Sequence, residues 1–116
     1  MKKTAWNWID ENAKHLVKMS DKIWGYAELG LWETRSSKLI ADELEKQGFK
    51  VTRGVAGMPT AFIAEYGAGK TTIGVQGEFD ALPLISQKFK TQKEPLTPGH
   101  AGHERRLLPG PAPRRP

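Results

Sequence analysis

LEKQGFKV, residues 44–51, is the stretch in which the hydrophobic pattern changes from a helical to an alternating period. The chain before it is predicted to be a helix over about residues 32–47, because its apolar side chains form one stripe: Leu39, Ile40 and Leu44. Gly48 suits the position that ends a helix, since glycine adopts the left-handed backbone without strain. Phe49, Val51 and Val55 follow and predict a first strand.

A longer helix is predicted on the amino-terminal side of this stretch. Thr4 can cap it, and most of its apolar residues recur at spacings of three and four: Trp6, Ile9, Ala13, Leu16, Val17, Ile23, Trp24 and Ala27. Gly25 and Gly30 mark a break after it. His15 lies near the apolar stripe and is interpreted as a structural or surface residue.

Two further strands are predicted downstream, over residues 60–66 and 71–79, and the short loop between them predicts an antiparallel hairpin. The expected fold class is therefore α/β, with two helices followed by a three-stranded segment. The loop also resembles a phosphate-binding loop, but Ala64 stands where that pattern needs its first glycine. A hairpin turn is the favoured interpretation.

Composition and charge limit the class of protein. The 116 residues suffice for one domain, and no apolar run approaches the ~20 residues that span a bilayer. There is no cysteine, which excludes disulfides and thiolate metal sites, and the cytoplasm is the simplest compartment. The net charge is +5, largely from arginines in residues 97–116, and the body has no basic stripe interleaved with aromatics. We therefore expect no nucleic acid and no membrane as partner.

Two places carry residue types suited to a site. Glu78 and Asp80 lie where a predicted strand ends and point to the same side of it, at the carboxyl end where α/β proteins commonly bind ligands. A solvated strand end is the alternative. His100, His103 and Glu104 place two imidazoles and a carboxylate within five residues, and both groups are zinc ligands. A pair of exposed loop histidines is the alternative there.

Several motifs together resemble the amino-terminal end of the M20 metallopeptidase and amidohydrolase family, and within it the aminobenzoyl-glutamate utilisation branch. They occur in order over about residues 4–100: YAELGL at 26–31, SSKLI at 36–40, LEKQGF at 44–49, GMPTAF at 57–62 and GEFDALP at 77–83. The resemblance implies that residues 1–98 are part of a zinc-peptidase-like catalytic domain and that residues 99–116 are a tail rich in proline and arginine.

The resemblance also implies a reaction. Members of the family use a pair of divalent metals, zinc or manganese, to polarise an amide carbonyl and activate water, with a glutamate as general base. The expected substrate is a small-molecule amide of the N-acyl amino acid or aminobenzoyl-glutamate type.

The family pattern assigns roles to four positions. Asp80 would orient the metal shell, and Glu78 stands where other branches have a histidine ligand. The second motif reads Gly-His-x-Cys-Gly-His, whereas this chain has Gly99-His100-Ala101-Gly102-His103. His103 is then the nominal metal ligand and His100 its upstream neighbour, and the missing residue is the cysteine.

Beyond His103 the family pattern stops, and the composition becomes that of coding sequence read out of frame. Our hypothesis is a frameshifted or truncated amidohydrolase gene product, with a disordered tail and no hydrolysis by the chain alone. An unpaired sheet edge would favour self-association. The alternative is a small non-enzymatic binding domain that uses its basic tail.

Overall fold

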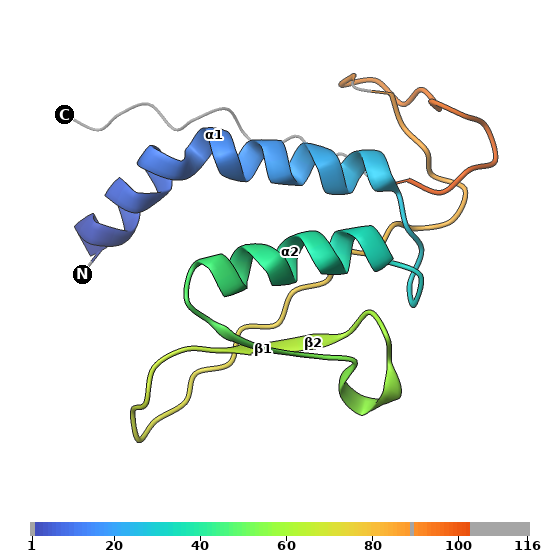
Figure 1. Ribbon diagram of the computed structural model, residues 1–116. Helices are drawn as coiled ribbons and strands as arrows, with labels where there is room; N and C mark the ends of the chain where they lie inside the picture. The colour runs from blue at the N-terminus through green and yellow to red at the C-terminus, as the bar shows by residue number, and fades with distance from the viewer. Residues whose placement is uncertain (1, 89, 103–116) are drawn as a thin grey trace.

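Two helices lie side by side above a two-stranded antiparallel sheet in the computed structural model, which describes residues 2–88 and 90–102 (Figure 1). Helix α1 spans Lys2–Tyr26 and helix α2 spans Thr34–Lys46. Strand β1 (Lys50–Arg53) pairs with strand β2 (Phe62–Glu65), and the 3-10 turn η1 (Val55–Gly57) lies between them. Helix α2 forms the middle layer, so the mixed α/β class is confirmed.

Helix α2 ends as the sequence predicts. Gly48 has a φ of 89°, and its N–H donates to the carbonyl of Glu45 at 3.0 Å. The N–H of Phe49 donates to the carbonyl of Leu44, also at 3.0 Å. These two bonds satisfy carbonyls that the end of a helix leaves unpaired, and the left-handed glycine turns the chain into β1.

Helix α1 begins earlier than expected, so the prediction that Thr4 caps it is wrong. The helix already includes Lys2 and Lys3, whose straight side chains lose little freedom in a helix. His15 joins α1 to α2, because its Nε2 lies 3.1 Å from Oε1 of Glu43. This contact, on a half-exposed side chain, agrees with the structural interpretation of His15.

The sheet pairs different segments from those expected. Val51 lies opposite Ala64, and Arg53 lies opposite Phe62. Phe62 and Ala64 are half-buried while Ile63 is exposed, which is the alternation of a sheet with one covered face. The turn that closes this pair includes Gly54, whose φ is 70° and whose N–H donates to the carbonyl of Ala61 at 2.8 Å.

The predicted third strand and its hairpin with residues 60–66 are therefore wrong for the described chain. Residues 71–79 form no strand, and their side chains Ile73 and Val75 are 85% and 95% exposed. A strand needs a partner for its backbone groups, and the chain instead makes a wide turn after Gly67 (φ 85°) (Figure 1). The ring of Phe79 returns to the sheet and stacks on Phe62 with 6.2 Å between the ring centres.

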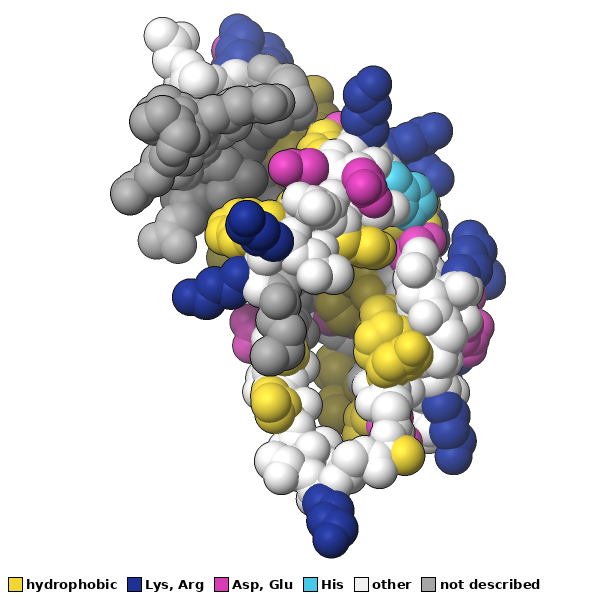
Figure 2. Space-filling model, turned by 90° about the vertical axis from the view of Figure 1, so that its left-hand side faces the viewer, with side chains coloured by type: hydrophobic (Ala, Val, Ile, Leu, Met, Phe, Trp, Pro, Cys, Tyr) yellow, Lys and Arg dark blue, Asp and Glu magenta, His cyan; other side chains and the backbone are white. Residues whose placement is uncertain are grey.

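Among the described residues, those that are buried most completely are small. Ala41 and Ala81 are fully buried, together with the polar residues Ser36, Ser37 and Thr60. Many large apolar side chains stay accessible, for example Trp6 on α1 at 65%. Figure 2 shows hydrophobic side chains on the floor of a hollow, with Lys and Arg side chains around the outline. Much of the apolar surface is thus uncovered.

No helix among the described residues combines the length and the hydropathy that crossing a bilayer requires.

The two glycines of the helix ends predict opposite effects on stability. Gly48→Ala places a side chain on a left-handed backbone and should lower the free energy of unfolding by about 1–2 kcal/mol. Gly25→Ala lies in the last turn of α1 with open space around it, and should raise that free energy by up to about 1 kcal/mol. Urea unfolding monitored by circular dichroism measures both, and equal effects would contradict the helix ends described above.

Candidate functional site

The carboxylate of Glu28 caps helix α2 from outside the helix. Glu33 occupies the N-cap position but makes no side-chain capping bond. Oε1 of Glu28 accepts the backbone N–H of Arg35 at 3.1 Å and its Nε–H at 2.9 Å. Oε2 accepts the backbone N–H and the hydroxyl of Ser36, each at 2.9 Å. Glu28 therefore satisfies donors that the first turn of a helix leaves unpaired.

These bonds set the charge state of Glu28. Burial of the carboxylate raises its pKa, but the backbone N–H of Ser36, the Arg35 guanidinium and the other donors together lower it from 4.5 to about 2. Each donor stabilises the ionised form more than the neutral form. The side chain is consequently a carboxylate at any ordinary pH, which also suits the positive end of the α2 dipole.

The backbone of Glu28 holds the segment that follows residues 71–79. Its carbonyl accepts the N–H of Ala81 at 2.7 Å, and Leu29 forms a parallel bridge with Ala81. Asp80 is half-buried beside the same loop: a Cβ on Gly30 would lie 3.7 Å from Oδ2 of Asp80 and 4.0 Å from Oε1 of Glu33. Two carboxylates thus face one glycine.

A second connection joins α2 to the loop before β2. The hydroxyl of Thr60 donates to Oε2 of Glu33 at 2.7 Å, and the hydroxyl of Ser37 donates to the carbonyl of Thr60 at 2.6 Å. All three residues are buried or half-buried. The amino-terminal turn of α2 is therefore joined directly to the Glu28 loop and to the loop before β2, and through Glu28 to Ala81.

The two segments that carry the predicted site residues also meet. Leu82 and Gly102 exchange N–H···O bonds of 2.9 and 3.0 Å in an antiparallel bridge. The N–H of Ser86 donates to the carbonyl of His100 at 3.1 Å. Gly102 is required here, because a Cβ would come within 2.5 Å of the Cα of Ser86.

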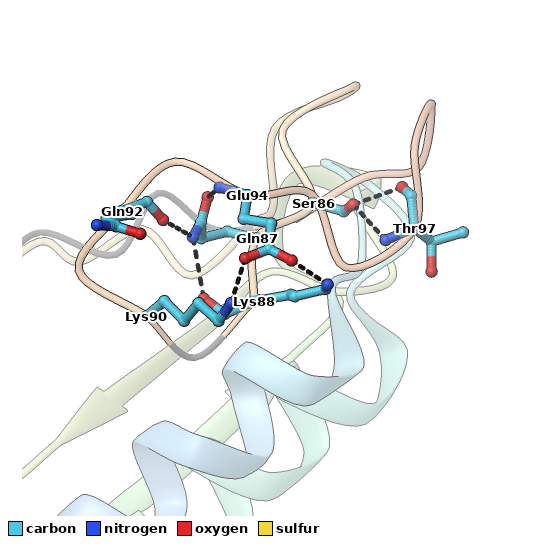
Figure 3. Close-up of polar contacts among 7 residues, drawn as sticks. All are labelled: Ser86, Gln87, Lys88, Lys90, Gln92, Glu94 and Thr97. Atoms are coloured by element: carbon cyan, nitrogen blue, oxygen red, sulfur yellow. Dashed lines mark hydrogen bonds and ion pairs between the residues drawn. The ribbon is translucent and has the colours of Figure 1, made fainter.

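A polar loop connects these segments (Figure 3). The hydroxyl of Ser86 donates to the carbonyl of Thr97 and accepts the N–H of Thr97, which closes the base of the loop. Inside it, Gln87 donates to the carbonyl of Gln92 at 2.7 Å and accepts the N–H of Glu94 at 3.0 Å. The side chains of Lys88 and Lys90 pair with Glu94. The loop thereby brings His100 back towards the segment of Asp80.

The predicted site residues are only partly gathered. Asp80 lies at the junction with Glu28, whereas Glu78 is exposed on the segment without strand structure, so the argument that both point to one side of a strand no longer holds. His100 is exposed, and His103 and Glu104 lie outside the described residues. Within residues 2–88 and 90–102, no group of three or more His, Cys, Asp or Glu side chains could hold a metal ion. The described residues therefore do not fit a metal centre by themselves.

A cavity of about 430 Å³ lies elsewhere, between α2 and β1, with Lys38, Asp42 and Arg53 in its lining. Lys38 and Arg53 each pair with Asp42, at 2.7 and 2.9 Å, and Arg53 also pairs with Glu45 at 3.0 Å, so two carboxylates neutralise the two cations. Asp80 is not part of this lining, and we assign the cavity no chemistry.

Sequence reasoning missed Glu28, although it lies in the YAELGL motif. A signal was present, because residue 33, at the start of the predicted helix, is not one of the usual capping types: Ser, Thr, Asp or Asn. The sequence thus indicates that a cap is missing, but capping rules reach only the adjacent residues and do not identify Glu28 as its replacement. The phosphate-loop interpretation of residues 64–71 is wrong, since no helix follows Lys70 in the described chain.

These observations define a mixed α/β chain in which four of the five sequence motifs lie near the amino terminus of α2, and known proteins show what the chain resembles. No family model and no solved structure matches the chain. It is 40% identical over 96 residues to a p-aminobenzoyl-glutamate hydrolase subunit of Escherichia coli, a match that covers 82% of this chain and 20% of that protein.

Further relatives agree. Thermostable carboxypeptidase 1 of Saccharolobus solfataricus is 32% identical over 111 residues, covering 90% of this chain and 28% of the relative. Hippurate hydrolase of Campylobacter jejuni is 30% identical over 96 residues, covering 78% and 25%. These relatives belong to the M20 peptidase and amidohydrolase family, so the chain is similar to that family over most of its length, and it spans between a fifth and just over a quarter of the length of these curated relatives.

Acid should weaken the fold through Glu28. Because the folded state lowers the pKa of Glu28 from 4.5 to about 2, its stabilisation is complete above pH 4.5 and is lost as the pH falls towards 2. Glu28→Gln should remove this part of the pH dependence and no more than about 3 kcal/mol of stability at pH 7. Urea unfolding across pH 2–7 measures it. The exposed Glu11→Gln should keep the wild-type slope, and a Glu28→Gln slope equal to wild type would contradict the capping role.

Gly102→Ala should open the bridge between Leu82 and Gly102. The new Cβ would meet the Cα and N of Ser86 and the carbonyl of Ile85 at 2.5–2.9 Å, and these backbone atoms can give way only if the loop moves. Amide exchange at Leu82 and residue 102 should accelerate. Gly74→Ala is the matched control, because its Cβ meets nothing within 4 Å. Unchanged protection in Gly102→Ala would show that the bridge does not form.

Proposed function

We propose that this chain is the amino-terminal part of the catalytic domain of a metal-dependent M20 amidohydrolase. Residues 1–98 would belong to a zinc-peptidase-like domain, with residues 99–116 as a tail. The observation that carries the proposal is the 40% identity over 96 residues to a p-aminobenzoyl-glutamate hydrolase subunit. The cytoplasm stays the predicted compartment.

The proposed substrate is an amide of the N-acyl amino acid or aminobenzoyl-glutamate type. Two relatives are named for p-aminobenzoyl-glutamate and for hippurate, and both compounds join an aromatic acyl group to an amino acid through an amide bond. This shared chemistry supports the substrate class. A non-enzymatic binding domain with a basic tail gains no support from these names.

The proposed activity needs groups beyond the described residues. Zinc or manganese would polarise the amide carbonyl in such an enzyme. Asp80 would orient the metal shell, His103 and His100 would lie near it, and Glu78 would take the place of a histidine ligand. Since the described residues do not assemble three metal donors, we derive no catalytic step from them. The chain alone is proposed to be inactive.

The uncovered apolar surface supports the same proposal. Trp6 and Val17 on α1, and Ile73 and Val75 on the unpaired segment, are more than half exposed. Isolated soluble domains rarely leave so many large apolar side chains in contact with water. We propose that the remainder of a catalytic domain covers these surfaces in the longer relatives. In the isolated chain, self-association through an exposed sheet edge stays a prediction.

Complementation in trans tests the proposed function. The 116-residue chain is co-expressed with the part of the Escherichia coli hydrolase subunit outside its match, about four-fifths of that protein. The purified pair should hydrolyse p-aminobenzoyl-glutamate with added manganese or zinc, and a chelator should abolish the reaction. The chain alone should show none.

Two variants sharpen this experiment. Asp80→Asn should lower the turnover of the pair by roughly 10–100-fold, as expected for a residue that orients metal ligands. Asp10→Asn, on an exposed site of α1, should leave it unchanged. Hydrolysis by the chain alone would refute its incompleteness, and a stable but inactive pair would refute the assignment as an amidohydrolase.

A further inference from the structure

We propose that Glu28 is the positioning residue for Asp80. Its side chain accepts hydrogen bonds from the amino terminus of α2, while its backbone carbonyl accepts a hydrogen bond from the N–H of Ala81. The inference deepens the proposed function and rests on it for the role of Asp80. Glu28 itself would touch neither metal nor substrate. Its task would be to set the distance between helix α2 and the segment of residues 80–82.

Glu28 makes these two sets of hydrogen bonds with different groups, its carboxylate and its backbone carbonyl. The carboxylate accepts bonds from Arg35 and Ser36, all between 2.9 and 3.1 Å. The carbonyl accepts the N–H of Ala81 at 2.7 Å. Because one residue makes both sets of bonds, a displacement of α2 is transmitted directly to Ala81.

The hydrogen bond between Glu28 and Ala81 also restrains the position of Asp80. Ala81 is 1% exposed, so packing fixes it on all sides. Consecutive Cα atoms are about 3.8 Å apart, which ties the backbone of Asp80 to the same place. A Cβ built on Gly30, two residues after Glu28, would lie 3.7 Å from Oδ2 of Asp80, so this carboxylate is close to the same loop. The position of Asp80 therefore follows that of the loop around Glu28.

The backbone of that loop is itself held in an uncommon conformation. Ala27 and Leu31, which flank it, have φ values of 47° and 68°. Residues other than glycine reach this left-handed region only at a cost, so the surrounding contacts must impose it. Glu28 lies between them and provides such contacts, with bonds from both its side chain and its carbonyl.

Backbone hydrogen bonds also connect this region to the segment of residues 99–102. Leu82 follows Ala81 and exchanges two backbone bonds with Gly102. Ser86 then binds the carbonyl of His100. A continuous series of backbone bonds thus runs from Glu28 to the segment that precedes His103.

Amide exchange of the full chain, followed by nuclear magnetic resonance, tests the proposal without any assay of activity. Glu28→Gln replaces one carboxylate oxygen by an amide donor that faces other donors. The hydrogen bonds to the amino terminus of α2 should therefore be weakened or lost. The comparison variant is Ala41→Gly, which weakens α2 at a buried site in the middle of the helix, outside the first turn that Glu28 caps. At equal global stability, the N–H of Ala81 should exchange roughly tenfold faster in Glu28→Gln than in Ala41→Gly.

Equal exchange at Ala81 in the two variants would overturn the proposal, because Glu28 would then act only through overall stability. A wild-type chain in which this N–H is unprotected would also overturn it. If Glu28→Gln does not fold, Glu28→Asp keeps the charge with one methylene less, and its Ala81 exchange must still exceed that of Ala41→Gly. If complementation fails but the N–H of Ala81 exchanges faster in Glu28→Gln than in Ala41→Gly, the proposed function is refuted and the positioning role of Glu28 stands.

Discussion

The carboxylate of Glu28 meets the amino terminus of α2, where several backbone N–H groups have no partner within the helix. Arg35 and Ser36 donate hydrogen bonds to it, and the backbone carbonyl of Glu28 accepts the N–H of Ala81. Helix, loop and the segment of Asp80 are consequently one assembly. Without this contact, the middle layer of the fold and the best-placed residue of the candidate site would have no common point of attachment.

Polar contacts of this kind matter more here than in most small domains. The buried apolar residues are Ala41 and Ala81, whereas Trp6, Trp32 and Ile73 face water among the described residues. Burial of large side chains is normally the main driving force for folding. Because few of the described apolar residues are fully buried, the fold depends also on capping, on backbone bridges and, as we propose, on the rest of a catalytic domain that its relatives contain.

Local rules predicted the local features. The stripe of Leu39, Ile40 and Leu44 and the left-handed Gly48 placed α2 and its end within about two residues. The prediction of which strands pair was wrong, because the alternation at residues 71–79 indicates a segment able to form a strand but does not show whether a partner strand is present. Glu28 escaped notice since its contacts lie seven and eight residues away, beyond the reach of capping rules. The motif order led to Asp80 and to the M20 family, while the ligand role of His103 stays a prediction.

The most direct measurement is the scalar coupling transmitted through a hydrogen bond, recorded on the isotopically labelled chain. A cross-peak between the nitrogen of Ala81 and the carbonyl carbon of Glu28 is predicted, because the N–H···O distance of 2.7 Å places them in a short bond. A cross-peak from Ala81 to a different carbonyl would contradict the central role given to Glu28. So would the absence of any coupling in a chain whose other bonds, such as Leu82 to Gly102, are detected.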